Sequence, residues 1–270
     1  MIYFPNAKIN LGLNIVSKRS DGYHNLETIF YPIAIKDGLE IVEADGLEAD
    51  VFFQEGIPVG GDSRDNLVMK ALRLMRQQYT FPFLEVYLLK KIPFGAGIGG
   101  GSADAAFMLR LVNDMYALNA SEADLAQLAM KLGADCPFFI YNSPMYAEGI
   151  GEKLEEIELN LDAYHLVLVK PDVFISTKEA FSRIVPMQPL INLKEIVKLP
   201  VEEWRYKMFN DFEKSVFPLF PQIEEIKNKL YKMGAVYASM TGSGSSVYAI
   251  FRERVDGIED EFSDCFVWKN

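Results

Sequence analysis

The sequence of 270 residues predicts an α+β protein with two domains. Between residues 3 and 16 apolar side chains alternate with polar or small ones, which is typical of a strand with one buried face. The glycine-rich stretch at 95–101 leads directly into residues with the apolar spacing of a helix. Because the alternation of strand and helix patterns starts again after Gly149, we divide the chain into domains at 1–155 and 156–270.

The other elements follow from apolar periodicity and from residues that start or stop helices. Strands are predicted at 23–30, 39–44, 49–53, 83–89, 165–169, 236–240 and 247–251. Helices are predicted at 66–79, 102–116, 122–132, from 177 onward, and at 209–233 with a break at Pro218 to Pro221. The residues whose side chains can cap the first turns of these helices are Asp65 or Asn66, Ser102, Ser121 and Ser176.

Composition excludes several classes of protein. The chain is 50% hydrophobic and 24% charged, and no apolar run reaches the roughly 18 residues of a membrane span. The first residues lack the basic segment of a signal peptide, so we expect a cytoplasmic protein. The two cysteines, Cys136 and Cys265, have no metal-type spacing. The net charge of −11 argues against binding to nucleic acid or an anionic membrane, and nothing in the sequence implies an obligate protein partner.

Five glycines ahead of the predicted helix indicate a phosphate-binding loop: Gly95, Gly97, Gly99, Gly100 and Gly101. Glycine adopts positive φ and carries no side chain, so such a loop can turn its N–H groups toward an anion, and the start of a helix adds positive potential. A dinucleotide fold would need a second parallel strand with an acidic residue soon after the helix, but another helix pattern follows instead. The P-loop would need a lysine at its end, and a protein kinase would need His-Arg-Asp and Asp-Phe-Gly; all are absent from the sequence. The alternative is that these glycines only let a strand and a helix pack closely.

A few polar residues stand out beside this loop. Lys8 and Asn10 share the polar face of the first predicted strand, although a solvated lysine is the commoner outcome for a strand taken alone. Lys90 precedes the loop and adds positive charge, or else lies on a solvated strand edge. Asp135 stands directly before an apolar run, where it is either functional or only a helix N-cap. A second glycine- and serine-rich loop at 241–246 is either a flexible turn or a lid over phosphate.

Three separated motifs resemble, in order, the three motifs of the GHMP kinases, the superfamily of galactokinase, homoserine kinase and mevalonate kinase. They are Pro-Asn-Ala-Lys-Ile-Asn-Leu at 5–11, the loop and helix start at 93–106, and Met-Thr-Gly-Ser-Gly-Ser-Ser at 240–246. Asp-Gly-Tyr-His-Asn-Leu at 21–26 is similar to the members that phosphorylate a cytidine diphosphate-linked methylerythritol. The chain departs from that pattern at Ala103 and Cys136, neither of which supplies an indispensable group.

This resemblance implies the two-domain GHMP kinase fold, with an N-terminal ATP-binding α/β domain that contains a left-handed βαβ crossover and a C-terminal ferredoxin-like domain. It also implies transfer of the γ-phosphoryl group of ATP, with Mg²⁺, to the 2-hydroxyl group of the methylerythritol substrate in the non-mevalonate route to isoprenoid precursors. Phosphoryl transfer depends on positioning and charge stabilisation. By resemblance, Asp135 takes the proton of the hydroxyl group and Lys8 neutralises charge on the moving phosphoryl group.

The resemblance also assigns the binding residues. Those for ATP are Asn66, Lys90, Pro93, Gly95, Gly97, Gly99, Gly100, Gly101, Ser102 and Ala103, with the Ser102 hydroxyl group as a ligand of Mg²⁺. Those for the substrate are Asn10, Tyr23, His24, Phe30, Thr177, Phe181, Thr241 and Gly242. Tyr23 and Phe181 would stack on the cytosine base and His24 would meet its polar edge; the alternative is that both aromatic rings belong to the core.

Two other functions stay open. One is a GHMP kinase for another substrate, such as homoserine or mevalonate, which the Asp-Gly-Tyr-His stretch at 21–24 disfavours. The other is a noncatalytic nucleotide-binding protein, which the presence of both Lys8 and Asp135 disfavours.

Overall fold

The computed structural model describes residues 1–46, 48–58, 60 and 62–270. The chain divides into two compact units, which we describe one at a time. The first unit comprises Met1–Lys8, Pro32–Phe94 and Gly99–Ser143, and the second comprises Ile9–Tyr31, Gly95–Ile98 and Pro144–Asn270.

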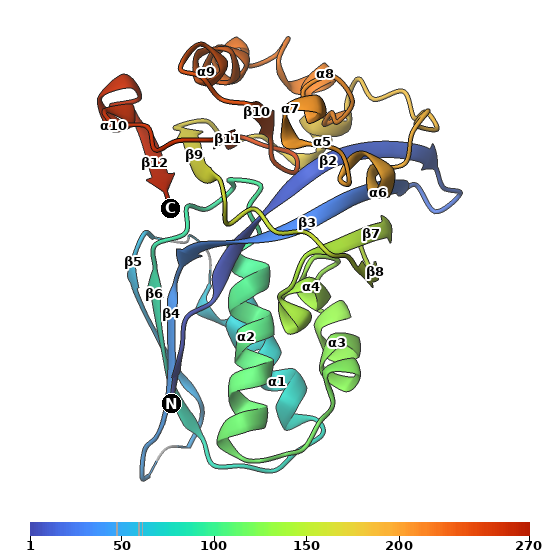
Figure 1. Ribbon diagram of the computed structural model, residues 1–270. Coiled ribbons are helices and arrows are strands. Elements are labelled where there is room, and N and C mark those ends of the chain that lie inside the picture. The colour runs from blue at the N-terminus through green and yellow to red at the C-terminus, as the bar shows by residue number, and fades with distance from the viewer. Residues whose placement is uncertain (47, 59, 61) are drawn as a thin grey trace. The chain divides into compact units, whose positions relative to one another are not determined.

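The first unit is a sheet covered by helices (Figure 1). The strand order is β1-β4-β6-β5, with bounds β1 Ile2–Tyr3, β4 Gly38–Glu43, β5 Val51–Gly56 and β6 Leu84–Lys90. The helices are η1 Ser63–Asp65, α1 Leu67–Arg76, α2 Gly100–Met115, α3 Glu122–Met130 and α4 Cys136–Tyr141. Strands β5 and β6 are parallel and α1 connects them, whereas β4 is antiparallel to both β1 and β6. In β6, Leu84, Val86 and Leu88 are buried, while the intervening Tyr87 and Leu89 are exposed, so one face of the sheet supports the helices.

Two of the predicted helix starts in this unit are confirmed and one is wrong. The Asn66 side chain caps α1 by accepting the Val68 N–H, and Ser121 forms a capping box at α3. Ser102, however, is not an N-cap: α2 begins two residues earlier, at Gly100, and Gly99 occupies the cap position with φ 73°. Glycine costs about 1 kcal/mol in a helix relative to alanine, and close packing of the first turn overrides that cost here, as shown below.

The second unit contains two four-stranded sheets. The first has the order β2-β3-β7-β8, with bounds β2 Asn6–Lys18, β3 His24–Lys36, β7 Met145–Gly149 and β8 Lys153–Glu156. The other is antiparallel with the order β10-β11-β9-β12, with bounds β9 His165–Pro171, β10 Tyr237–Met240, β11 Val247–Phe251 and β12 Cys265–Lys269. The helices are α5 Thr177–Phe181, α6 Leu193–Ile196, α7 Val201–Trp204, α8 Glu213–Val216, α9 Pro221–Lys232 and α10 Ile258–Glu261.

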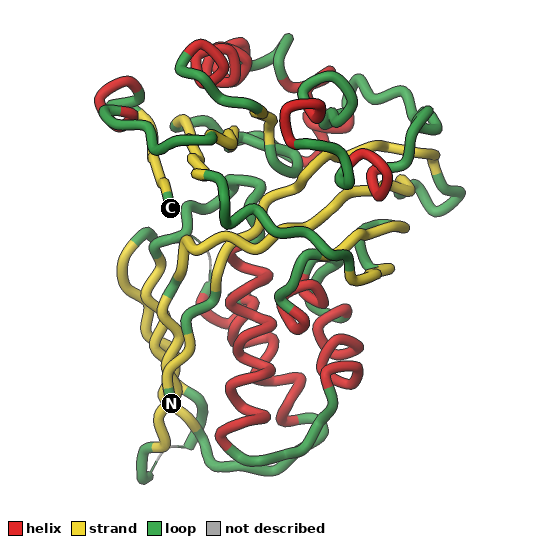
Figure 2. The backbone as a smooth tube through the Cα atoms, in the orientation of Figure 1, coloured by secondary structure: helices red, strands yellow, loops and turns green. Residues whose placement is uncertain are grey.

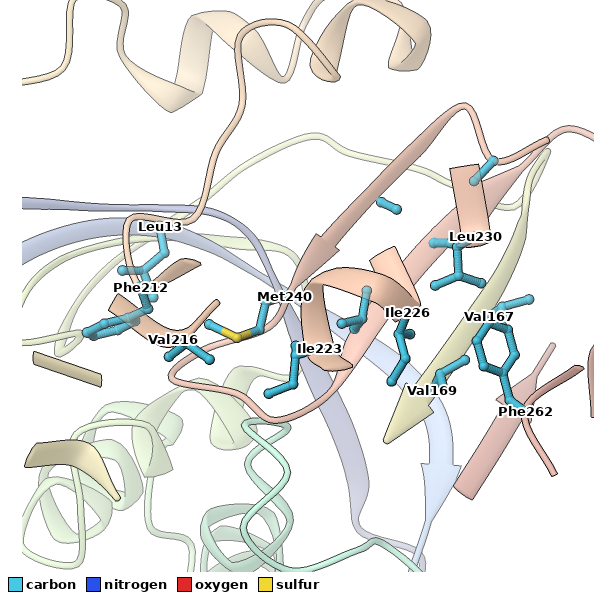
Figure 3. Packing of buried hydrophobic residues seen from close by; sticks show 14 of the residues in the cluster. Leu13, Val167, Val169, Phe212, Val216, Ile223, Ile226, Leu230, Met240 and Phe262 are labelled. Atoms are coloured by element: carbon cyan, nitrogen blue, oxygen red, sulfur yellow. The ribbon is translucent and has the colours of Figure 1, made fainter. Parts of the chain in front are cut away.

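A hydrophobic core fills the space between α9 and the second sheet (Figure 3). Helix α9 packs against β10 and β11 and contributes Ile223, Ile226 and Leu230, each of which is at least nine-tenths buried. These side chains recur at helical spacing, so one stripe of α9 faces the sheet. Met240 is fully buried in the same core and ends β10, which fixes the point where the 241–246 loop begins.

Figure 2 shows how the chain alternates between strand, helix and loop. The strands expected at 39–44, 83–89 and 247–251 are observed within one residue of their predicted ends, and the capping box at Ser176 is confirmed at α5. The sequence analysis missed β7, β8 and β12 and the short helices α4, α6, α7 and α10. Strand β8 has the sequence Lys-Leu-Glu-Glu and is mostly exposed, so it lacks the apolar alternation by which a strand is predicted. Across the described ranges, no helix is long and apolar enough to cross a membrane.

Candidate active site

Lys8 and Asp135 meet in the first unit. The Lys8 Nζ atom lies 3.4 Å from Asp135 Oδ2, and the Lys8 side chain is 4% exposed while that of Asp135 is 37% exposed. Asp135 occupies the N-cap position of α4, but in the described structure its side chain does not cap the helix. The carboxylate is therefore paired with an ammonium group and still reachable from solvent, which suits a group that contacts a substrate.

The start of α2 lies beside this pair. A Cβ atom added at Gly99 would lie 2.8 Å from the Phe139 ring and 3.3 Å from Lys8 Cε, so the loop backbone passes directly over the lysine stem. The first N–H groups of α2 are unpaired within the helix and, with the helix dipole, favour an anion at this end. Lys8, the α2 terminus and Asp135 thus form a polar group suited to an anionic ligand, which we call the phosphate-side cluster.

Gly100 is required by close packing. A Cβ atom there would lie 2.6 Å from Ile92 Cγ2, closer than real Cβ contacts allow, whereas a Cβ atom at Gly101 would meet nothing nearer than Leu67 Cδ1 at 3.7 Å. We expect Gly100→Ala to lower the free energy of unfolding by about 1–3 kcal/mol through overpacking. Urea unfolding measures the change, and Gly101→Ala is the matched control, which should keep or slightly raise stability. Equal stability of the two variants would contradict the packing explanation.

Lys90 lies in a buried ion cluster with Asp37 and Asp104. Its Nζ atom contacts Asp37 Oδ2 and lies 2.7 Å from Asp104 Oδ2, and all three side chains are at most 5% exposed. The other oxygen of Asp37 accepts the N–H groups of Lys91 (2.5 Å) and Ile92 (2.8 Å). This cluster therefore ties the end of β6 to the first turns of α2, on the path into the glycine-rich loop.

The charge balance of this cluster is unusual. Two carboxyl groups face one ammonium group, and in the described structure Asp104 Oδ1 has no hydrogen-bond partner. Burial raises the pKa of Asp104 to about 7; Lys90 opposes the rise and Asp37 adds to it. The alternative expectation of a solvated lysine at the strand edge is therefore wrong for Lys90.

Asn10 is the centre of a buried polar group in the second unit. Its backbone N–H donates to the Thr241 hydroxyl group (3.0 Å), and its side-chain amide donates to the Thr28 hydroxyl group (2.9 Å). The Thr28 hydroxyl group donates in turn to the carbonyl group of Gly12 (2.5 Å). Thr241 Oγ1 also lies 3.2 Å from the carbonyl oxygen of Gly97. Strand β2 and two loops distant in sequence are thus joined, and we call this the threonine cluster.

The two loops of the threonine cluster approach each other backbone to backbone. A Cβ atom at Gly97 would lie 2.3 Å from the carbonyl oxygen of Thr241, and one at Gly242 would lie 2.9 Å from that of Gly97. Both glycines have positive φ, 72° and 56°. Only glycine satisfies both conditions, so the 241–246 loop is a packed element here, and the expectation of a flexible turn is wrong for its first residues.

The aromatic residues assigned to the base by resemblance lie in the second unit. The Phe181 ring stacks on His24, with ring centroids 4.7 Å apart and planes at 21°, and meets Phe212 edge to face. Tyr23 is 63% exposed, whereas Phe30 is buried. Thr177 begins α5, four residues before Phe181. Phe181 is thus half-buried, with one ring face covered by a histidine.

The remaining assigned residues are placed as follows. Asn66 caps α1, Pro93 and Ala103 are buried, and Ser102 lies in the first turn of α2 beside the Cys136 thiol. Burial raises the pKa of Cys136 to about 12, so this cysteine is a packed thiol and no nucleophile. Sequence reasoning singled out neither Asp37 nor Thr28, because an isolated polar residue in a strand pattern carries no sign of the distant partner that it meets.

Comparison with known proteins first identifies the class of protein to which the chain belongs. The model of the GHMP kinase N-terminal domain matches residues 66–143, and that of the GHMP kinase C-terminal domain matches residues 192–267. A solved mevalonate kinase superposes with a TM-score of 0.74 at 14% identity, over 100% of this chain and 98% of that one, which shows a shared fold. The chain is a GHMP kinase in both halves, and the predicted fold class is confirmed.

Relatives of higher sequence identity identify the family within this class. A protein of Parabacteroides distasonis named 4-diphosphocytidyl-2-C-methyl-D-erythritol kinase is 57% identical over 270 residues, covering 100% of this chain and 98% of the relative. One of the same name from Porphyromonas gingivalis is 46% identical over 272 residues, covering 100% and 99%. A crystal structure of 4-(cytidine 5'-diphospho)-2C-methyl-D-erythritol kinase superposes with a TM-score of 0.84 at 28% identity, over 100% of this chain and 98% of that one. The chain belongs to the family of 4-diphosphocytidyl-2-C-methyl-D-erythritol kinases.

Proposed function

We propose that this chain transfers the γ-phosphoryl group of ATP to the 2-hydroxyl group of 4-diphosphocytidyl-2-C-methyl-D-erythritol, giving the 2-phosphate and ADP. The observation that carries the proposal is the Lys8–Asp135 pair at 3.4 Å, beside the glycine-rich start of α2. The relatives of that name, which match almost end to end, support the choice of substrate. The reaction serves isoprenoid precursor synthesis in the cytoplasm.

The roles of the reacting groups follow from charge. Asp135 accepts the proton of the attacking hydroxyl group, and it is exposed enough to reach a bound substrate. Lys8 balances negative charge on the phosphoryl group during transfer, since a preorganised cation near that group needs no rearrangement. The backbone N–H groups at the start of α2, with Gly95, Gly97 and Gly99 of the loop, hold the ATP phosphates. In this proposal Asn66, Lys90 and Pro93 also contact ATP.

Mg²⁺ fits this arrangement as a partner of ATP. Among the described residues, no group of three or more histidine, cysteine, aspartate or glutamate side chains is placed to hold a metal ion. Mg²⁺ in kinases is held largely by substrate phosphates and waters, with one or two protein oxygens, so a protein cage is not required. We propose the Ser102 hydroxyl group as a protein ligand. When bound, Mg²⁺ neutralises phosphate charge.

The substrate side of the proposal lies in the second unit. Thr177, Asn10, Thr241 and Gly242 contact the polar parts of the cytidyl substrate, and Tyr23, His24, Phe30 and Phe181 form its base pocket. The half-buried Phe181 ring, already stacked on a planar side chain, supports a stacking role for this residue. We further propose that residues 1–155 and 156–270 are the two domains, a division supported by family matches that end before and begin after the boundary.

The base pocket gives a specific prediction. Because stacking of a base on an aromatic ring contributes about 1–3 kcal/mol, Phe181→Leu should raise KM for the cytidyl substrate roughly tenfold and leave KM for ATP nearly unchanged. His24→Ala should reduce discrimination against the uridine analogue, since a polar edge left unpaired is what rejects the wrong base. Steady-state kinetics with both nucleotides test this, and Phe53→Leu is the matched control because Phe53 stacks on Tyr87 in the first unit. Equal losses for ATP and the cytidyl substrate would assign both residues to the fold.

The proposed function as a whole is tested by ATP consumption. Purified protein should consume ATP with the diphosphocytidyl substrate and not with mevalonate or homoserine. Turnover of either control at a comparable rate would favour another GHMP kinase. ATP binding with no turnover of any of the three would favour a noncatalytic nucleotide-binding protein.

A further inference from the structure

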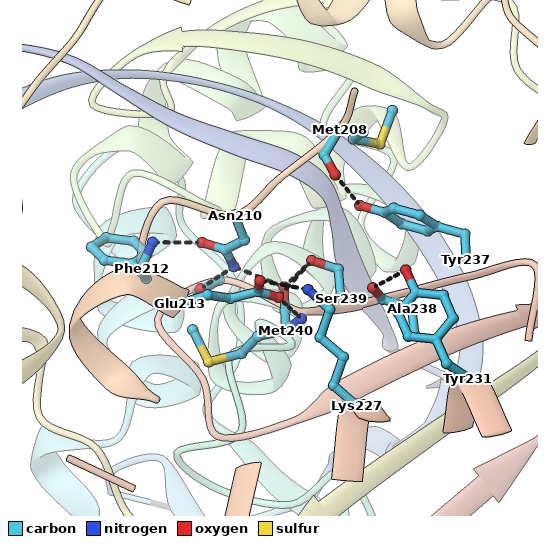
Figure 4. A network of polar contacts seen from close by, with 11 residues as sticks. Met208, Asn210, Phe212, Glu213, Lys227, Tyr231, Tyr237, Ala238, Ser239 and Met240 are labelled. Carbon is cyan, nitrogen blue, oxygen red and sulfur yellow. Dashed lines mark hydrogen bonds and ion pairs between the residues drawn. The ribbon is translucent and has the colours of Figure 1, made fainter. Parts of the chain in front are cut away.

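Asn210 is a buried residue whose side chain bonds backbone groups of the 241–246 loop. It is 2% exposed, and its Nδ2 atom donates both to the carbonyl group of Met240 (2.7 Å) and to that of Gly242 (2.9 Å). Its Oδ1 atom accepts the N–H group of Phe212 (3.0 Å). Figure 4 shows Asn210 with its bonds to Phe212 and Met240. One side chain thus binds the backbone carbonyl groups of the residues on both sides of Thr241.

The backbone around Asn210 is bonded to strand β2. The Leu13 N–H donates to the carbonyl group of Phe209 (2.9 Å), and the Asp211 N–H donates to that of Leu13 (2.8 Å). The Asp211 carboxylate accepts the Ile15 N–H (2.8 Å). Residues 209–211 therefore pair with the edge of β2, the strand that carries Asn10, and Asn210 connects this strand to the backbone on both sides of Thr241.

Glu213 holds the last residues of β10, directly before the same loop. Its Oε1 atom accepts the Met240 N–H (2.9 Å) and the Ser239 hydroxyl group (3.1 Å), and its Oε2 atom pairs with Lys227 at 2.6 Å. Figure 4 shows this pairing beside Asn210. The Met240 peptide is thus bound through its N–H by Glu213 and through its carbonyl oxygen by Asn210.

We propose that Asn210 is a positioning residue for phosphoryl transfer, holding Thr241 and Gly242 in register with Asn10. This inference rests on the proposed function, which assigns those three residues to the substrate. The chemistry requires a primary amide, because one nitrogen must donate to two carbonyl groups while the neighbouring oxygen accepts an N–H. An aspartate of the same shape would place a carboxylate oxygen against two carbonyl oxygens and remove the Asn210 donor from both.

The test compares Asn210→Asp with Tyr231→Phe. The control also removes a side-chain hydrogen bond to a β10 carbonyl group, that of Ala238 at 3.1 Å, but does not touch the loop. We expect Asn210→Asp to lower kcat/KM for the diphosphocytidyl substrate at least tenfold, since misplacement by about 1 Å can cost about 10²-fold, with ATP affinity within about threefold of wild type. Tyr231→Phe should retain wild-type kinetics. If Asn210→Asp does not fold, Asn210→Ser, which keeps a single donor, replaces it with the same expected direction.

Hydrogen exchange of the Asn210 variant shows whether Asn210 orders the loop or only stabilises the whole unit. It also gives a result that does not depend on the proposed function. In the Asn210 variant, amide exchange should accelerate within residues 239–246 and 10–15 and stay unchanged in α9. Wild-type kcat/KM in a folded Asn210 variant, or exchange that accelerates equally throughout the second unit, overturns the proposal. Wild-type protein that does not turn over the diphosphocytidyl substrate refutes the proposed function, while the exchange measurement still decides whether Asn210 orders the loop.

Discussion

Asp135→Asn and Lys8→Met should each lower kcat by about 10²-fold or more. Asparagine keeps the shape of the Asp135 side chain but cannot accept the proton of a hydroxyl group. Methionine keeps most of the length of the Lys8 side chain but carries no charge for the phosphoryl group. Because the proposed site holds the phosphates mainly through backbone N–H groups, we expect ATP affinity to change little. Single-turnover kinetics and ATP titration calorimetry measure the two quantities separately.

The control for the Asp135 and Lys8 variants is an ion pair on the protein surface. Lys207 and Glu203 are four residues apart in the sequence and pair at 2.6 Å, and Lys207→Met or Glu203→Gln should leave kcat unchanged. Circular dichroism should report a folded protein for all four variants. A folded Asp135→Asn or Lys8→Met protein with near-wild-type turnover would remove that residue from the reacting centre.

Local signals in the sequence predicted a large part of the fold. The caps at Asn66, Ser121 and Ser176 act within three residues along the chain, so their effect is visible from the sequence. The start of α2 was mispredicted because serine is a better N-cap than glycine on average, and the steric contact that permits only glycine comes from Ile92, eight residues away. A packing contact of that kind leaves no local pattern.

In the candidate site, too, local motifs were predicted from the sequence and long-range contacts were not. The glycine-rich loop, the Lys8 motif and Asp135 were singled out from the sequence, but the partners of other buried polar residues were not. Lys90 pairs with Asp37, which is 53 residues distant in sequence, and Asn210 bonds Gly242, which is 32 residues distant. Periodicity identifies which face of an element is buried, whereas the partner of a buried polar group depends on how distant elements pack. Family resemblance supplied the roles of the site residues, but it assigned no role to Asn210 or Asp104.

Lys90→Met should lower the free energy of unfolding by about 3–5 kcal/mol, the usual result of removing one partner from a buried ion pair. Asp37 and Asp104 would stay buried, with side chains 0% and 3% exposed, and both carboxyl groups would lose the ammonium group that they share. Lys198→Met is the matched control, since Lys198 pairs with Glu195 at 2.9 Å on the surface with both side chains largely exposed. Urea unfolding at pH 7 measures both, and a Lys90 variant as stable as the Lys198 variant would contradict a structural role for the cluster.

The same cluster should also make stability depend on pH. The pKa of Asp104 is about 7 in the folded state, compared with 3.8 for an ordinary aspartate, so between these values the folded protein binds more protons than the unfolded chain. Stability from this group is therefore fully present below about pH 4 and is lost as the pH rises through 7. Asp104→Asn removes the titration and keeps the shape, so the difference in unfolding free energy between variant and wild type should change in favour of the variant from pH 5 to pH 8. A difference that stays constant over this range would show that Asp104 is ionised in the folded protein throughout.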